Sequence, residues 1–125
     1  MKIERIQPIP LEKDVAKQYA RQITLEKIGQ SALNVKYLGG GSFGMAFSVE
    51  FADSEPIVVK FLRAKDMLEK EVFDLKLLGN HSPVKFPKVI FERKADDIIP
   101  LDCYAMEKVD GSSAFMSYLS RLLMR

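Results

Sequence analysis

The stretch from Leu38 to Val49, LGGGSFGMAFSV, is a glycine-rich turn that runs directly into an alternating apolar segment. Glycines at positions 39, 41 and 44 of this stretch form the pattern G-x-G-x-x-G. Glycine suits such a turn because it adopts positive φ and lets bare backbone N–H groups approach an anion closely. The spacing alone leaves two interpretations open, a phosphate-binding loop and an ordinary glycine-rich hairpin turn.

The residues after the turn predict a strand, because Met45, Phe47 and Val49 lie on one face at period two. In a dinucleotide-binding unit the glycines open a helix instead. A Walker-type loop ends in Gly-Lys-Ser/Thr, whereas Gly44 is followed by Met45. The remaining kind of phosphate-binding loop with this spacing is a glycine-rich β-hairpin that folds over a nucleotide. In such a site the next strand supplies a lysine.

Lys60 is the lysine that this hypothesis requires. It lies near the end of the β-branched run Ile57–Phe61, which follows the turn residues 53–56. Period two places Lys60 and Val58 on the same face of that strand. Taken alone, such a lysine is more often a solvated residue on an edge strand, so the interpretation of Lys60 depends on a partner carboxylate.

The segment from Asp66 to Leu78 predicts a helix that packs on the sheet and ends at Gly79 and Asn80. Its apolar band consists of Met67, Leu68, Val72, Leu75 and Leu78, with Phe73 and Leu77 to one side.

Glu71 is the expected partner of Lys60, because it lies at the edge of the buried face of this helix. Glu69 is a less favoured candidate, and Asp74 has a shorter reach. Such an ion pair would fix the direction of the lysine rather than supply much net stability, since desolvation offsets most of the Coulomb attraction.

Four motifs in chain order, Leu38–Gly44, Val58–Lys60, Glu71 and Tyr104–Gly111, resemble the amino-terminal lobe of the protein-kinase-like fold. The leading helix and the Met-Glu-x-Val-x-Gly segment are most similar to the aminoglycoside phosphotransferase and choline kinase group of small-molecule kinases. The resemblance covers residues 34–111. Four motifs in register are much more specific than any one of them.

The resemblance implies an ATP site in which Lys60 holds the α- and β-phosphates and Glu71 orients the lysine. The amides of residues 41–44 would cover the phosphates, and the backbone of Glu107 and Val109 would bond the adenine edge. The implied cofactor-binding residues are Leu38, Gly39, Gly41, Ser42, Phe43, Gly44, Ala46, Val58, Lys60, Glu71, Met106, Glu107 and Val109.

The adenine ring would lie between Leu38, Ala46, Val58 and Met106, with Met106 in the gatekeeper position. The family pattern has valine and alanine where this chain has Ala46 and Val58. Packed interiors tolerate such a volume-conserving exchange best, so we expect the pocket to keep its shape.

The predicted fold is α+β, a five-stranded antiparallel sheet with one packed helix. A leading helix at residues 11–28 is expected on the outside of the sheet, and a trailing helix after Gly111. We expect a leading extension at 1–30, the kinase-like lobe with its hinge at 31–111, and the start of a second-lobe helix at 112–125. The predicted strands are 31–38, 45–51, 57–61, 88–92 and 101–106.

Composition excludes several classes of protein. The chain has 125 residues, of which 47% are apolar, and a net charge of +2 with acids and bases intermixed. It has no basic stripe for nucleic acid, and no apolar run approaches the roughly 20 residues of a membrane span. We expect a cytoplasmic protein, because residues 1–5 do not resemble a signal peptide. Cys103, the only cysteine, is expected to be a buried apolar side chain.

The resemblance implies a phosphotransferase that uses ATP with Mg²⁺, but the catalytic-loop aspartate and the metal-binding aspartate of that family have no counterpart here. We therefore expect a fragment of a small-molecule kinase whose intact form moves the γ-phosphate to a hydroxyl acceptor. This chain alone would not be catalytically competent. Self-association through the trailing helix is a further expectation.

Two alternatives remain open. The chain could be a complete non-catalytic module that binds a nucleotide or a partner protein, or an unrelated α+β domain whose glycines form only a turn. The acceptor, and the choice between ATP and GTP, cannot be read from this stretch of sequence, because substrate choice in the resembled family lies in the other lobe.

Overall fold

The computed structural model describes residues 8–41, 44–81 and 87–108. Its elements follow the chain as α1 (Lys13–Ile28), β1 (Asn34–Gly40), β2 (Gly44–Glu50), β3 (Ile57–Leu62), α2 (Leu68–His81), β4 (Val89–Arg93) and β5 (Asp102–Glu107). The predicted class, α+β with a five-stranded antiparallel sheet, is confirmed. The helix expected after Gly111 lies outside the described residues.

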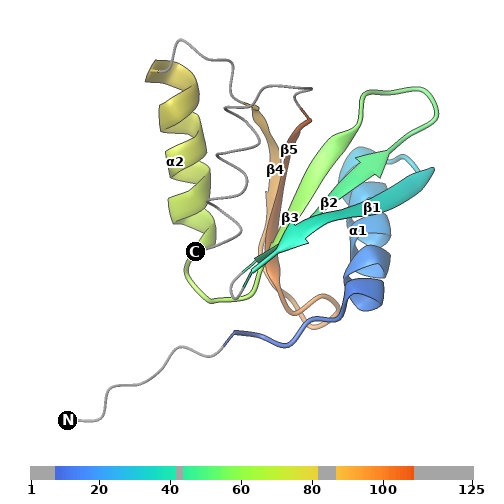
Figure 1. Ribbon diagram of the computed structural model, residues 1–125, viewed down its shortest axis with the longest axis horizontal. Coiled ribbons are helices and arrows are strands. Elements are labelled where there is room, and N and C mark those ends of the chain that lie inside the picture. The colour runs from blue at the N-terminus through green and yellow to red at the C-terminus, as the bar shows by residue number, and fades with distance from the viewer. Residues whose placement is uncertain (1–7, 42–43, 82–86, 109–125) are drawn as a thin grey trace.

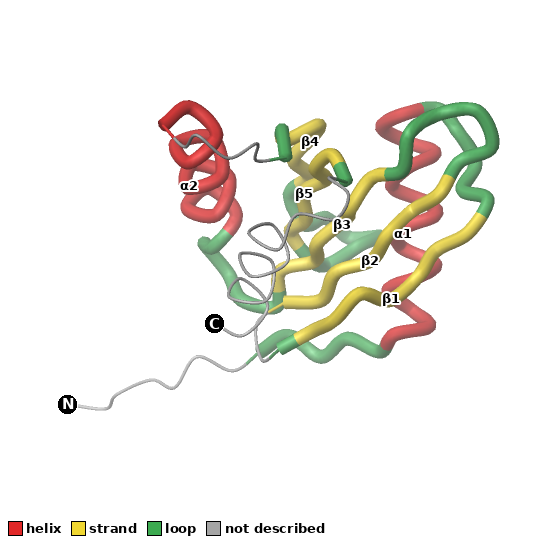
Figure 2. Tube along the Cα trace, turned by 45° about the horizontal axis from the view of Figure 1, so that its top comes forward, coloured by secondary structure: helices red, strands yellow, loops and turns green. Residues whose placement is uncertain are grey.

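The sheet is open, and its strands lie in the order β1-β2-β3-β5-β4 (Figure 2). Every neighbouring pair is antiparallel. Strand β3 is therefore central, and all six of its residues are buried. Lys60 lies on this central strand, which rules out the solvated edge-strand alternative.

The two helices cover opposite faces of the sheet (Figure 1). Because side chains alternate along each strand, the odd-numbered residues of β2 and β3 face α1 and the even-numbered ones face α2. The core on the α2 side consists of Ala46, Val58, Leu62, Leu68, Val72, Leu75, Tyr104 and Met106. The fold thus separates an apolar α1 face from an α2 face that also contains Lys60.

Helix α1 begins two residues later than predicted and packs through smaller side chains. Its buried residues include Ala16, Ala20 and Ile23, whereas Val15 of the predicted apolar face is 40% exposed. Alanine lets a helix approach a sheet closely, so the buried stripe is centred on the two alanines. The expected position of α1 on the sheet is nevertheless correct.

The predicted end of α2 at Gly79 and Asn80 is wrong, since the helix continues to His81. Glycine inside a helix costs only about 1 kcal/mol, so it does not force an end where the chain continues in helical geometry. The predicted apolar band is also too wide. Phe73 is 63% exposed and Leu77 is also exposed, whereas the buried apolar residues of α2 are Leu68, Val72 and Leu75.

Arg93, the last residue of β4, is a buried arginine whose partners come from two other segments. Arg93 donates hydrogen bonds from Nε to Glu26 Oε2 at 2.9 Å and from Nη2 to Asp96 Oδ2 at 2.7 Å. The bond from Arg93 lowers the pKa of Glu26, and the backbone N–H groups of Ile99 and Ile98, together with Arg93, lower the pKa of Asp96. This Arg93 cluster attaches the end of α1 to the far edge of the sheet.

Cys103 is buried, as expected of an apolar side chain, and burial raises the pKa of its thiol to about 12. Neither described helix is long and apolar enough to cross a membrane.

Candidate functional site

The glycine-rich stretch forms the hairpin between β1 and β2. Gly41 N–H donates to the Gly44 carbonyl oxygen at 3.0 Å and so closes the turn. Its tip, Ser42 and Phe43, lies outside the described residues. Tyr37 pairs with Phe47 and Gly39 pairs with Ala46, which makes Leu38 an extra residue on β1, a β-bulge.

The side chain of Lys60 lies next to Gly44 at the start of β2, where this hairpin ends. A Cβ atom added at Gly44 would come within 2.8 Å of Lys60 Cε and 3.5 Å of Lys60 Nζ. The lysine side chain therefore occupies the space that any larger residue at position 44 would need. The structure thus brings together the two elements that the sequence hypothesis joined, the end of the glycine-rich turn and the lysine of the next strand.

Lys60 and Glu71 form a buried ion pair. Lys60 Nζ donates to Glu71 Oε1 at 2.5 Å, and each side chain is only 1% exposed. The predicted choice of Glu71 over Glu69 is confirmed, because Glu69 is exposed and its nearest cation is Lys94 at 3.6 Å. Glu71 lies on the first turn of α2, so the pair links the central strand to that helix.

Tyr104 is a member of this cluster whose role sequence reasoning missed. Its hydroxyl donates to the same Glu71 Oε1 at 3.1 Å, and the tyrosine is fully buried. Tyr104 on β5 is the direct cross-strand neighbour of Lys60 on β3. Tyr104 lies two residues before Met106 on β5, but only the register of β5 against β3 places it beside Lys60.

Three of the four residues predicted to contact adenine lie together on this face. Val58 pairs with Met106 on one side and with Ser48 on the other, and Ala46 lies two residues from Ser48. Ala46, Val58 and Met106 are fully buried in the α2-side core. Leu38 is 38% exposed on the edge strand and does not belong to this core.

The end of β5 is already engaged in hydrogen bonds. Glu107 N–H donates to the Lys88 carbonyl oxygen at 3.0 Å, and Glu107 Oε1 accepts from Lys88 N–H at 2.9 Å. The N–H of Glu107 is thus occupied in this structure. Val109 lies outside the described residues. Lys108 Nζ donates to Ser48 Oγ at 3.0 Å and so joins the end of β5 to β2.

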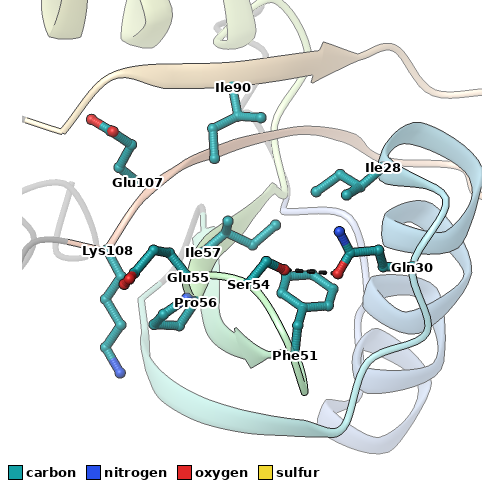
Figure 3. A pocket seen from close by; sticks show the side chains of 10 residues that line it. All are labelled: Ile28, Gln30, Phe51, Ser54, Glu55, Pro56, Ile57, Ile90, Glu107 and Lys108. Atoms are coloured by element: carbon teal, nitrogen blue, oxygen red, sulfur yellow. Dashed lines mark hydrogen bonds between the residues drawn. The ribbon is translucent and has the colours of Figure 1, made fainter.

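A cavity of about 540 Å³ is lined by Glu107, one of the predicted cofactor-binding residues, and by residues on the side of the sheet away from Lys60 (Figure 3). Its apolar wall includes Ile28, Phe51 and Ile57, and Ser54 Oγ donates to Gln30 Oε1 at its side at 2.7 Å. None of its lining residues belongs to the Lys60 cluster. We therefore place the candidate site on the geometry around Lys60 rather than on the size of this cavity.

No protein-family model matches the sequence, and no curated protein is similar enough to match it. The resemblance to kinase-like proteins therefore stays a prediction, which rests on the four sequence motifs and on the arrangement of Gly44, Lys60 and Glu71 described above.

Proposed function

We propose that this chain is the ATP-binding lobe of a phosphotransferase, in which Lys60 binds the α- and β-phosphates of the nucleotide. The observation that carries the proposal is the buried pair of Lys60 and Glu71 directly beneath Gly44, where the glycine-rich hairpin ends. A lysine buried on a central strand is rare unless it has a partner, and here the partner is the equally buried Glu71.

The residues present fit a triphosphate. The Lys60 ammonium supplies a cation, Glu71 fixes its direction, and the missing side chain at Gly44 leaves the hairpin backbone close to the lysine. Bound ATP would supply the phosphoryl group that the intact protein transfers to a hydroxyl acceptor. Among the described residues no group of three His, Cys, Asp or Glu side chains could hold Mg²⁺. The resembled family places that metal ligand in its other lobe.

Binding requires the α2 face to open. Ala46, Val58 and Met106 are fully buried, so an adenine ring reaches them only after the atoms that cover them move. The apparent affinity is then the intrinsic affinity multiplied by the population of the open form. We therefore expect weak binding of ATP by this chain.

The test is a calorimetric titration of Mg-ATP into this chain and into the double variant Lys60→Met/Glu71→Gln. The double variant removes both charges together, and the amide oxygen introduced by Glu71→Gln would still accept the Tyr104 hydroxyl. We expect the unsubstituted chain to bind one nucleotide and the variant to bind at least about tenfold more weakly, because a charge-assisted bond is lost. Equal affinity in both chains would remove the role assigned to Lys60.

A second candidate is a module that binds a partner protein, favoured by the exposure of Phe73 and Leu77 on the outer side of α2. These residues are four positions apart and therefore neighbours on one helix face. The same titration separates the two functions. A folded chain that gives no heat with Mg-ATP favours the partner-binding module, and saturable binding that depends on Lys60 favours the nucleotide lobe.

A further inference from the structure

The geometry around Glu71 points to a positioning residue beyond the lysine and the glutamate. We propose that the Tyr104 hydroxyl holds Glu71 turned in toward the sheet and thereby aims the Lys60 ammonium. The consequence for nucleotide binding rests on the proposed function, whereas the positioning itself does not.

Tyr104 is placed for this role by strand register. It lies directly opposite Lys60 on the neighbouring strand, and both side chains point to the α2 face. Residues directly opposite one another in an antiparallel pair have Cβ atoms about 5 Å apart, so the ring and the lysine stem run side by side. Both donors end on the same atom, Glu71 Oε1, at 2.5 Å for Lys60 Nζ and 3.1 Å for the Tyr104 hydroxyl.

The inward position of Glu71 carries a penalty that these two bonds must offset. Glu71 Oε2 is buried and has no hydrogen-bond partner among the residues that the structure describes. A buried carboxylate oxygen without a partner is unfavourable, because it has lost its water and gained nothing in return. The carboxylate is therefore held by its bonds at Oε1, and the tyrosine supplies one of the two.

Loss of the Tyr104 hydroxyl should weaken the binding of phosphate groups in particular. With one donor removed, Glu71 is less firmly held, and the ammonium that it directs points less consistently toward the hairpin. Phosphate binding depends on that direction. Binding of a nucleoside without phosphates does not, because its contacts would be with Ala46, Val58 and Met106.

The experiment compares Tyr104→Phe with Tyr19→Phe in the full chain. Each substitution removes one hydroxyl and keeps the ring, and Tyr19 packs on Phe61 on the opposite face of the sheet, with ring centroids 6.4 Å apart. Calorimetry is run with Mg-ATP and with adenosine. We expect Tyr104→Phe to weaken ATP binding about tenfold and to change adenosine binding by less than about twofold, in keeping with the loss of one bond to a charged group. Tyr19→Phe should change neither.

Two results would overturn the positioning role, an unchanged affinity for ATP in Tyr104→Phe and an equal loss of affinity for ATP and adenosine. The second would mean general damage to the site. If the unsubstituted chain binds neither ligand, the proposed function fails, and the positioning role is decided without nucleotide. The ¹³Cε NMR signal of Lys60 should then shift in Tyr104→Phe and stay in place in Tyr19→Phe, and an unshifted signal in both variants overturns the inference.

Discussion

At the scale of single residues, Lys60 and Glu71 depend on each other, because each side chain neutralises the buried charge of the other. Lys60→Met alone leaves the Glu71 carboxylate in the core without its cation, and we expect it to lower the free energy of unfolding by about 3–5 kcal/mol. Lys60→Met/Glu71→Gln should recover most of that loss, since no uncompensated charge remains. Urea denaturation of four chains, the unsubstituted one, Lys60→Met, Glu71→Gln and the double variant, measures these values.

Additive effects in this cycle would contradict the buried pair. If Glu71→Gln and Lys60→Met each destabilise the chain and the double variant loses the sum, the two side chains act independently.

Gly44 is a third residue on which the site depends. In Gly44→Ala the new methyl group would lie 2.8 Å from Lys60 Cε, so the lysine must shift, and we expect this shift to disturb its bond to Glu71. We expect a loss of Mg-ATP affinity of about fivefold or more, because a charge-assisted hydrogen bond depends steeply on its geometry. Titration calorimetry measures the affinity, and thermal melting verifies that the chain is folded.

The matched control for this methyl group is Gly79→Ala, since no atom lies within 4 Å of a Cβ at that position. An equal loss of ATP affinity in both variants would exclude a specific contact between Gly44 and Lys60.

At the scale of helices, replacing glycine by alanine should lower the stability of the chain at Gly29 and raise it at Gly79. Gly29 ends α1 with φ 79° and donates its N–H to the Leu25 carbonyl oxygen at 3.0 Å, so Gly29→Ala should cost about 1–2 kcal/mol of stability. Gly79 lies inside α2, so Gly79→Ala should stabilise the chain by up to about 1 kcal/mol. Thermal melting gives the sign of each effect, and a stabilising Gly29→Ala would contradict the left-handed end of α1.

Local pattern was enough to predict the elements on which the site depends. Alternation along 57–61 gave the face of Lys60, and helical spacing gave the approximate position of Glu71, because these periodicities belong to the backbone itself. The end of α2 and the packing stripe of α1 were predicted wrongly. Both depend on the shape of the sheet surface that each helix meets, which no local window contains.

Contacts between distant segments were missed for the same reason. Tyr104 reaches Glu71 across 33 positions and Arg93 reaches Glu26 across 67, so neither bond has a local signal in the sequence. A basic residue close in sequence to acidic residues is typical of an exposed turn. Arg93 is nevertheless buried, because Glu26 of α1 lies next to it. Register and tertiary packing decide such contacts.

For the whole molecule, the Arg93 cluster makes stability depend on pH in the acid range. The pKa values of Glu26 and Asp96 are lowered in the folded chain from their ordinary values of 4.5 and 3.8. A lowered folded pKa means that the contribution is complete above the ordinary pKa and is lost as pH falls through the lowered one. We therefore expect stability to decline below about pH 4.5, where the unfolded chain binds protons first.

Arg93→Met isolates this contribution, because it removes the cation that both carboxylates share. The variant should be less stable at neutral pH and should lose less stability between neutral pH and about pH 3 than the unsubstituted chain, as followed by urea denaturation at each pH. Parallel stability curves for the two chains would contradict a role of the cluster in acid sensitivity.

The central claim concerns where on the whole molecule a nucleotide binds, and NMR mapping of backbone amides tests it most directly. On addition of Mg-ATP to the full chain, we predict shifts that cluster at Gly41 and Gly44, at Lys60, and at Met106, with little change along α1. Shifts that instead cluster around Ile28, Phe51 and Ile57 at the cavity, or saturating Mg-ATP that moves no signal, would contradict it.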